Sequence, residues 1–563
     1  MKRCVLLILL SMLIKQIYGQ QPAYEIVIDA KKKVGSLKPI WAYFGYDEPN
    51  YTYMKDGRKL LTELAQMNKV PVHVRVHNLL TTGDGTPALK WGSTNAYTED
   101  GKDNAIYDWH IVDSIFDTFI ERGMKPIAEI DFMPKALSIK PEPYQHHWTP
   151  GIAYDSIYTG WAYPPESYEK WAELVHQWVR HCIERYGESE VKTWYWEVWN
   201  EPNIGYWKGS REEYFKLYDY SVDAVKRALP SARVGGPTTT GPRWDVAADF
   251  LKTFLEHCRN GKNYATGKKG APLDYVTFHA KGDPKIVNEH VQMNMAVQLQ
   301  DIEKGFEIVA SFPAYKKLPV IIGESDPEGC AACSVDFNPQ NAYRNGTMYS
   351  SYTAASFARI FTLAEKYGVN IEGAVSWSFE FENQKWFAGF RDLATNGVDK
   401  PVLNVFRMFN LMEGNMIKTT NKDAIILDSL VTTGVRGRQT DVDVLASVDE
   451  HSLSAMIWNY HDDDDDVEDS FKTAHVNLLV KNISAEKVLL YHYRVDKQFS
   501  NSYQVWKIMG SPQNVSQQQY RQLEQAGQLQ LFTSPIWTKV ENKEMVTSFS
   551  LPLQAVSLIK IVW

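Results

Sequence analysis

The sequence predicts a mixed α/β protein in which a (β/α)8 TIM barrel carries an accessory antiparallel β-sandwich domain. Eight apolar, strand-like runs alternate with helix-like segments between about residues 38 and 415, as in a barrel with insertions. No Gly-x-Gly-x-x-Gly turn follows an early strand, which disfavours an open doubly wound sheet. After about residue 420 the apolar runs become short and alternate in polarity, which is typical of sandwich strands.

The barrel elements follow one another in regular order. The strands are expected at residues 40–46, 70–77, 125–131, 192–201, 233–239, 274–280, 318–325 and 372–379. Helices near 56–68, 109–122, 166–186 and 210–228 are expected after the first four strands, and a helical stretch after each of the others. Because such barrels place their reacting groups at the C-terminal ends of the strands, polar residues there are the candidates for a site.

The remaining segments predict the second domain. Its strands are expected at residues 453–460, 475–480, 488–493 and 549–563, with one more contributed by 24–28. The predicted division is therefore a barrel over 38–415 and a sandwich over 22–37 plus 416–563. Five consecutive aspartates at 462–466 offer oxygen ligands for calcium, but spaced ligands and a glycine turn are missing, so a solvated loop is favoured.

The N-terminus has the pattern of a signal peptide over residues 1–20. A basic start at 1–3 precedes an apolar stretch at 4–14, which is too short to span a bilayer. We therefore expect export to the periplasm or the cell exterior. The net charge of −8 argues against nucleic acid or an anionic membrane as a partner.

Four cysteines remain after the predicted cleavage: Cys182, Cys258, Cys330 and Cys333. No second cysteine pair or His-x-x-x-His motif accompanies Cys330 and Cys333, so a zinc site is disfavoured. A local disulfide or two free thiols is the preferred interpretation.

Glu201 is the strongest candidate for chemistry. Aromatic residues make up 13% of the chain, with 18 Trp and 31 Tyr, and aromatic faces suit the stacking of sugar rings. Glycoside hydrolysis requires two facing carboxyl groups, one of which protonates the leaving oxygen. Glu201 ends the run Trp-Tyr-Trp-Glu-Val-Trp-Asn-Glu-Pro at 194–202, where Pro202 ends the expected strand. Strand alternation places Glu197 deeper in the barrel, and Asn200 is expected to bind a sugar hydroxyl.

Glu324, at the end of the seventh strand, is the expected nucleophile. Asp326 is its main rival on that strand, and Glu380 and Glu382 follow the eighth strand. Glu129 and Asp131 on the third strand are expected to be structural or to orient the substrate.

Further polar and aromatic groups occur at the same strand ends. Arg75 and His77 close the second strand, and His279 closes the sixth. Trp377 is a candidate for stacking under the sugar, with a role in the core as the alternative.

Several segments together resemble glycoside hydrolase family 39, which contains β-xylosidases and α-L-iduronidases. They are Trp-Asn-Glu-Pro-Asn at 199–203, Tyr-Phe-Lys-Leu-Tyr at 214–218, Val-Gly-Gly-Pro at 234–237, Gly-Met-Lys-Pro at 123–126, Phe-Met-Pro at 132–134, Asp-Tyr-Val at 274–276, Trp377 with Lys-Pro at 400–401, and, in the sandwich, Tyr-Arg-Val-Asp at 493–496, Asn-Ser-Tyr at 501–503 and 506–512. The resemblance covers most of residues 40–560.

The resemblance implies Glu201 as general acid/base and Glu324 as nucleophile of a retaining, exo-acting enzyme. It places His77, Asn200 and His279 at substrate-contacting positions, and it implies neither cofactor nor metal. The expected partner is a glycoside or oligosaccharide; the sequence leaves the oligomeric state open.

The resemblance restricts the identity of the sugar less than it restricts the mechanism. A β-xylosidase-like substrate is the first expectation. The run Glu-Ser-Asp-Pro at 324–327 is closer to the Glu-Ala-Asp-Pro of iduronidases, and residues 78–82 lack the acidic pair often seen in xylosidases. The alternatives are a uronate, an arabinoside or another pentose. Lys281 and Arg391 are candidates for gripping a uronate carboxylate. An inactive carbohydrate-binding protein is the alternative from another class, which the presence of both carboxylates disfavours.

Overall fold

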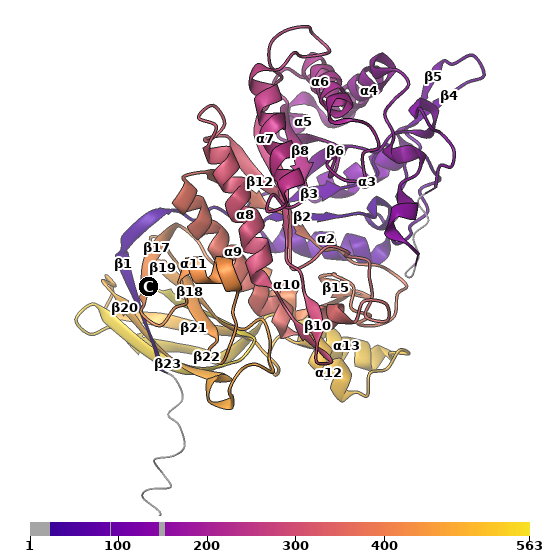
Figure 1. Ribbon diagram of the computed structural model, residues 1–563. Coiled ribbons are helices and arrows are strands. Elements are labelled where there is room, and N and C mark those ends of the chain that lie inside the picture. The colour runs from indigo at the N-terminus through magenta and orange to yellow at the C-terminus, as the bar shows by residue number, and fades with distance from the viewer. Residues whose placement is uncertain (1–22, 91, 146–151) are drawn as a thin grey trace, which may run out of the picture.

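The computed structural model describes residues 23–90, 92–145 and 152–563. It contains a helix-covered barrel and a second, sheet-rich domain (Figure 1), which confirms the predicted fold class. The segment predicted as a signal peptide lies outside the described residues. Among the helices in the described ranges, none is long and apolar enough to cross a membrane.

The barrel is a parallel sheet in the order β13-β12-β9-β8-β7-β6-β3-β2-β14. Its strands are β2 (Tyr43–Tyr46), β3 (His73–Val76), β6 (Lys125–Ile130), β7 (Tyr195–Val198), β8 (Arg233–Thr239), β9 (Tyr275–Lys281), β12 (Pro319–Asp326), β13 (Asn370–Ala374) and β14 (Ser376–Trp377). Only one residue separates β13 from β14, so the two are pieces of one eighth strand. The barrel closes because β13 pairs with β12 while β14 pairs with β2.

Helices follow the strands and cover the barrel. The main helices are α2 (Lys55–Met67), α3 (His110–Ile120), α4 (Tyr168–Tyr186), α6 (Arg211–Ala228), α7 (Asp245–Asn260), α8 (Met295–Ala310), α9 (Thr347–Tyr367) and α10 (Pro401–Asn410), with the short α5 (Glu188–Val191) and α11 (Leu427–Thr433). Local sequence fixes several of their starts. Ser210 and Glu213 form a reciprocal capping box at α6, and Ser167 accepts a hydrogen bond from the backbone of Lys170 at α4.

Three hairpins project from the barrel loops. They are β4 (Tyr97–Glu99) with β5 (Ala105–Tyr107), β10 (Lys285–Val287) with β11 (His290–Gln292), and β15 (Ala394–Thr395) with β16 (Val398–Asp399).

Close packing at the barrel seam requires a glycine. Gly45 on β2 pairs with Trp377 on β14, and a Cβ atom added at Gly45 would lie 2.4 Å from the indole ring. Only a residue without a side chain therefore allows Trp377 to close the barrel at this depth.

The second domain is built from one nine-stranded sheet around its own apolar core. The sheet order is β22-β21-β24-β19-β18-β17-β1-β20-β23. The strands are β1 (Ala23–Ser36), β17 (Asn415–Asn421), β18 (Asp441–Val448), β19 (Ser452–Tyr460), β20 (Thr473–Lys481), β21 (Lys487–Val495), β22 (Gln530–Lys539), β23 (Glu544–Pro552) and β24 (Ala555–Val562). Pairing is antiparallel except between β1 and β20, which run parallel.

The sandwich differs from the sequence prediction in its last segments. The single run expected at 549–563 is two strands, because a turn at Leu553 and Gln554 separates β23 from β24, and Gln554 adopts a φ of 57°. The predicted strands also did not include β17, β18 or β22, and helices α12 (Ser502–Ile508) and α13 (Gln517–Gly527) were not predicted. For α13 a signal was present, because Ser516 and Gln519 form a capping box at its start.

The aspartate run was expected to be a solvated loop, and for its first residues this is wrong. Asp462 and Asp463 are 0% and 1% exposed. The carboxylate of Asp462 accepts hydrogen bonds from the backbone N–H groups of Met295 and Val435 and from the hydroxyl of Tyr460. Asp462 therefore joins the start of α8 in the barrel to β19 in the sandwich.

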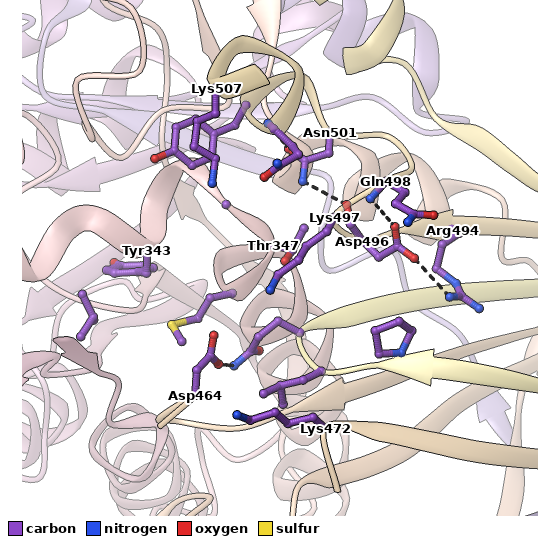
Figure 2. Close-up of a pocket in the computed structure, with 18 of the residues that line it drawn as sticks. Tyr343, Thr347, Asp464, Lys472, Arg494, Asp496, Lys497, Gln498, Asn501 and Lys507 are labelled. Carbon is purple, nitrogen blue, oxygen red and sulfur yellow. Dashed lines mark hydrogen bonds and ion pairs between the residues drawn. The ribbon is translucent and has the colours of Figure 1, made fainter. Parts of the chain in front are cut away.

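A hollow of about 890 Å³ lies where the barrel and sandwich meet, and Figure 2 shows the side chains that line it. Its wall is held by Asp496, which pairs with Arg494 at 3.3 Å and accepts a backbone hydrogen bond from Gln498 at 2.7 Å. Asn501 donates to the carbonyl of Asp496 at 3.0 Å. The carboxylate of Asp496 and the side chains of Ser500 and Asn501 thus fix the loop between β21 and α12.

Cys330 and Cys333 form a disulfide, in agreement with one of the two states expected from their spacing. Cys182 and Cys258 are free and buried.

Candidate active site

A cavity of about 450 Å³ lies at the C-terminal ends of the barrel strands, where the sequence predicted the site. Five of the predicted residues line it: His77, Asn200, Glu201, Glu324 and Trp377. The sixth, His279, contacts Glu201 from behind. The barrel therefore brings together side chains that are far apart in the sequence.

The backbone around Glu201 differs from the prediction. The β7 strand ends at Val198, three residues before Glu201, so strand alternation does not orient Glu201 relative to Glu197. Trp199 and Glu201 have φ values of 67° and 42°, in the left-handed region that non-glycine residues seldom adopt. The N–H of Glu201 donates to the carbonyl of Thr238 at 2.9 Å, which holds this bend against β8.

Glu201 and Glu324 face each other across His279. Nδ1 of His279 lies 2.8 Å from Oε1 of Glu201 and 3.6 Å from Oε1 of Glu324. One carboxylate oxygen of each glutamate and a ring nitrogen of His279 all lie within 4.8 Å of one another. All three side chains are buried, so their interactions are weakly screened by water.

Lys281 supplies positive charge between the two carboxylates. Its Nζ forms an ion pair with Oε2 of Glu324 and lies 3.7 Å from Oε1 of Glu201. Burial favours the neutral form of both acids, but at each of them the neighbouring cations and hydrogen bonds together outweigh burial. Together with the hydrogen bond from His279, Lys281 holds the pKa of Glu201 below its ordinary value. Burial lowers the pKa of His279 itself.

Arg75 connects the barrel interior to the floor of the cavity. Its fully buried guanidinium donates to Glu197 at 2.5 Å, to Glu129 at 2.5 Å and to Oδ1 of Asn200 at 3.0 Å, and it lies 3.3 Å from Glu324. This cation, with Lys281 and the ring nitrogens of two histidines, holds the pKa of Glu324 well below its usual range in spite of burial. Glu324 is therefore ionised, as a nucleophile must be.

His77 is held as a cation at the opposite side of Glu324. Burial alone would lower the pKa of His77, but Glu129 at 2.6 Å, with Asp131 and Glu324, raises it well above its ordinary value. Its Nε2 lies 3.3 Å from Asp47 and 3.5 Å from Glu324. The ring packs 4.5 Å from that of Trp377.

The three rival acids have other partners. Asp326 ends β12, where its carboxylate accepts a hydrogen bond from the backbone N–H of Trp377 at 3.0 Å, and burial raises its pKa to about 7. Glu380 accepts from the backbone of Gly397 and Glu382 from that of Asp56. None of these three acids lines the cavity.

Within the part of the chain that the structure describes, two clusters have the ligand types and spacing that a metal ion requires. They are His77 with Glu129 and Asp131, and Glu201 with His279 and Glu324. Each cluster already includes or contacts a protein cation, protonated His77 with Arg75 in the first and Lys281 in the second. The carboxylate charge is thus balanced by side chains of the chain itself.

Several cavity residues were missed by the sequence analysis. Asp47 directly follows β2, so its strand-end position was a usable signal. Trp244 and Arg243 lie in the β8–α7 loop, and Lys90 lies in the long connection between β3 and α3. Nothing in the sequence separates these loop residues from many others, because their positions depend on how the long loops fold.

Comparison with known proteins gives consistent matches. A model of the family described as glycosyl hydrolases family 39 matches residues 24–537. A β-xylosidase of Caldicellulosiruptor saccharolyticus is 27% identical over 540 residues, covering 94% of this chain and 96% of its own. An α-L-iduronidase of Mus musculus is 24% identical over 538 residues, covering 89% and 75%. The crystal structure of a monomeric β-xylosidase from Caulobacter crescentus CB15 matches with a TM-score of 0.73 at 21% identity, covering 96% of this chain and 99% of that one. At this level of identity, the structural match shows a shared fold.

Proposed function

Because the chain belongs to glycosyl hydrolases family 39, and is thus a glycoside hydrolase acting on carbohydrate, we propose that it is an exo-acting β-xylosidase that retains anomeric configuration. The observation that supports this most is the approach of Glu201, His279 and Glu324 within 4.8 Å at the end of the barrel. Retaining enzymes place their carboxyl groups about 5–5.5 Å apart, whereas inverting enzymes separate them by roughly 6.5–9.5 Å to admit a water molecule.

In the first step, the ionised carboxylate of Glu324 attacks the anomeric carbon while protonated Glu201 gives its proton to the departing oxygen. The bond from carbon to the leaving oxygen breaks as the ester to Glu324 forms. In the second step, ionised Glu201 takes a proton from water, and that water displaces Glu324. Each glutamate thus returns to its starting state.

The proton on Glu201 is governed by Lys281. In the empty site the lysine and His279 favour the ionised form of Glu201, which is the form required for the second step. A substrate that separates the Nζ of Lys281 from Glu201 would raise the pKa of that acid and prepare it for the first step.

Two residues are suited to grip the sugar beside the reacting carbon. Arg75 donates to Oδ1 of Asn200, which leaves the amide nitrogen of Asn200, at the cavity wall, to donate to a sugar hydroxyl. Protonated His77 is the second donor. Bonds to the sugar hydroxyls can strengthen in the transition state.

The proposed specificity for xylosides is supported by similarity to relatives, including the β-xylosidase that aligns with this chain over nearly its full length. A specific observation favours a uronide as the second candidate: Lys281, expected to suit a uronate carboxylate, lines the cavity. Arg391, named for the same role, does not line it. Arg391 is fully buried and donates to the carbonyl of Trp377 and to Glu328, so its predicted contact with substrate is wrong.

The test is hydrolysis of a panel of aryl glycosides that differ only in the sugar, with the configuration of the first product read by NMR before it mutarotates. We expect the β-xyloside to have the highest kcat/KM and to release β-xylose. A higher kcat/KM for the α-L-iduronide would favour the second candidate. Release of the inverted anomer, or absence of turnover across the panel, would contradict the proposed mechanism or the activity.

Export through the N-terminal 20 residues belongs to the same proposal. Its check is the mass of the N-terminal peptide of protein recovered from the expressing bacterium, which should begin near residue 20.

A further inference from the structure

Trp244 is unusual among the aromatic residues that line the active-site cavity. Its side chain is 52% exposed, whereas Trp377 is 1% exposed and Tyr206 is 7% exposed. Large aromatic faces in a cavity wall are suited to stacking on the apolar faces of sugar rings. Trp244 is thus an accessible aromatic surface close to the reacting groups.

The loop that carries Trp244 is joined to the loop that carries the acid/base. The side-chain amide of Asn203 donates to the hydroxyl of Thr240 at 2.7 Å, and the N–H of Thr240 donates back to Asn203 at 3.0 Å. Two residues before Thr240, in β8, the carbonyl of Thr238 accepts a hydrogen bond from the N–H of Glu201. A platform at Trp244 therefore keeps a fixed position relative to Glu201.

The turn itself is also fixed. The N–H of Trp244 donates to Gly241 at 3.2 Å, and the N–H of Arg243 donates to the buried carboxylate of Asp301 at 3.0 Å. The guanidinium of Arg243 lies 5.4 Å from the centre of the indole ring. The exposure of Trp244 is thus a property of an ordered turn, and a sugar that stacks there loses little freedom in the protein.

The cavity has a closed side and an open side. Asp47, His77, Lys90 and Trp377 form the closed side and are all less than 7% exposed. Arg243 and Trp244 form the open side. Because an acid/base protonates the oxygen of the leaving group, the leaving group must lie next to Glu201 and beyond it. The sugar that is attacked fits the closed side, and the leaving group extends to the loop that carries Trp244.

We propose that Trp244 forms a leaving-group subsite, in which a second sugar ring stacks on the indole while Arg243 donates to its hydroxyl groups. This inference rests on the proposed function and extends it: the preferred substrate is a disaccharide or the end of a longer chain. A glycoside with a small, non-cyclic leaving group would not use this subsite.

The test compares two substrates that share the sugar for which the wild-type protein has the highest kcat/KM. One is the disaccharide; the other is the glycosyl fluoride, whose leaving group is too small to reach Trp244. Trp244→Ala should lower kcat/KM for the disaccharide roughly tenfold, the scale of a lost aromatic stacking contact, and change that for the fluoride less than about twofold. Trp244→Phe should retain most activity on both. The control is Val246→Ala, a nearby exposed apolar residue that does not line the cavity, and it should leave both substrates unaffected.

A second measurement tests the same subsite through glycosyl transfer, in which the subsite binds an acceptor sugar. With the fluoride as donor, an added sugar should accept the glycosyl group and yield a disaccharide in the wild type, and Trp244→Ala should suppress this transfer. Equal losses on both substrates, or no loss on the disaccharide, would overturn the subsite. Failure of the wild type to hydrolyse any glycoside would instead contradict the proposed function.

Discussion

Nδ1 of His279 lies 2.8 Å from Oε1 of Glu201, and the opposite ring nitrogen, Nε2, is buried without a hydrogen-bond partner among the described residues. Because burial lowers the pKa of His279 and so favours the neutral ring, the one proton of that form is placed where an acceptor exists, on Nδ1. His279 therefore donates to Glu201 and stabilises its carboxylate. The same nitrogen is 3.6 Å from Glu324, so one ring helps orient both acids.

Removal of the acid should depend on the leaving group. Glu201→Gln is expected to lower kcat by roughly 10²–10⁴-fold for substrates with alkoxide leaving groups, because no proton is available for the departing oxygen. Activated aryl leaving groups should be affected less in the first step. The measurement is kcat for a series of glycosides that share one sugar and differ in the pKa of the leaving group.

The matched control for this variant is Glu382→Gln, which replaces a glutamate outside the cavity. It should retain wild-type kinetics across the series. Full activity of Glu201→Gln on poor leaving groups would show that another residue supplies the proton.

The nucleophile can be replaced by an external anion. Glu324→Gly removes the carboxylate that attacks the anomeric carbon and leaves space beside Lys281 and His77. Added azide should restore turnover of an activated glycoside and give a glycosyl azide of inverted configuration, identified by NMR. If azide restores Asp326→Gly but not Glu324→Gly, the attacking group is Asp326.

Lys281 should set the pH range of activity. The lysine lowers the pKa of both Glu324 and Glu201. As pH increases, kcat/KM should first rise because Glu324 ionises and then fall because Glu201 loses its proton. Because both pKa values are low, the optimum should be acidic. Lys281→Met removes this charge, both pKa values rise, and both limbs of the profile should move to higher pH. The control is Lys304→Met, whose ammonium pairs with Glu307 on the exposed face of α8. Limbs that stay in place in Lys281→Met would show that the lysine does not control these acids.

Arg75 should contribute more to stability than any surface arginine. Arg75→Met leaves Glu129 and Glu197 buried without their cation, and breaking a buried ion pair in this way costs roughly 3–5 kcal/mol. The exposed pair of Arg185 with Asp117 provides the comparison, because Arg185→Met should cost at most about 1 kcal/mol. Urea unfolding followed by circular dichroism measures both, and equal midpoints for the two variants would disprove the assignment.

Most of the barrel could be predicted because its strands are short apolar runs separated by amphipathic helices. The predicted seventh strand at 318–325 and the observed β12 (Pro319–Asp326) differ by one residue at each end. The prediction was wrong at Glu201, because strand periodicity was applied to a residue that lies beyond the end of β7. The backbone there turns into left-handed conformations held by Thr238. This hydrogen bond joins the loop after β7 to β8, and no local sequence pattern predicts it.

Charge patterns were the least reliable guide. A run of aspartates is normally solvated, yet Asp462 is buried at the domain junction, where its carboxylate accepts hydrogen bonds from the backbone N–H groups of Met295 in the barrel and Val435 beyond it. Arg391 likewise had the right charge for a substrate carboxylate, but it is fully buried and donates to Glu328 and to backbone carbonyls instead. Both outcomes depend on partners that the sequence does not place nearby.

The position of β1 has a consequence for synthesis. This strand precedes the whole barrel in the chain, yet it lies between β17 and β20, which are made hundreds of residues later. At roughly 5–20 residues per second, a ribosome delivers those partners on the order of tens of seconds after β1. During that interval Ile26 and Ile28, buried in the finished protein, have no sheet to join. A chain that stops before β17 therefore displays an unpaired apolar strand, which chaperones and proteases can recognise as a mark of incomplete protein.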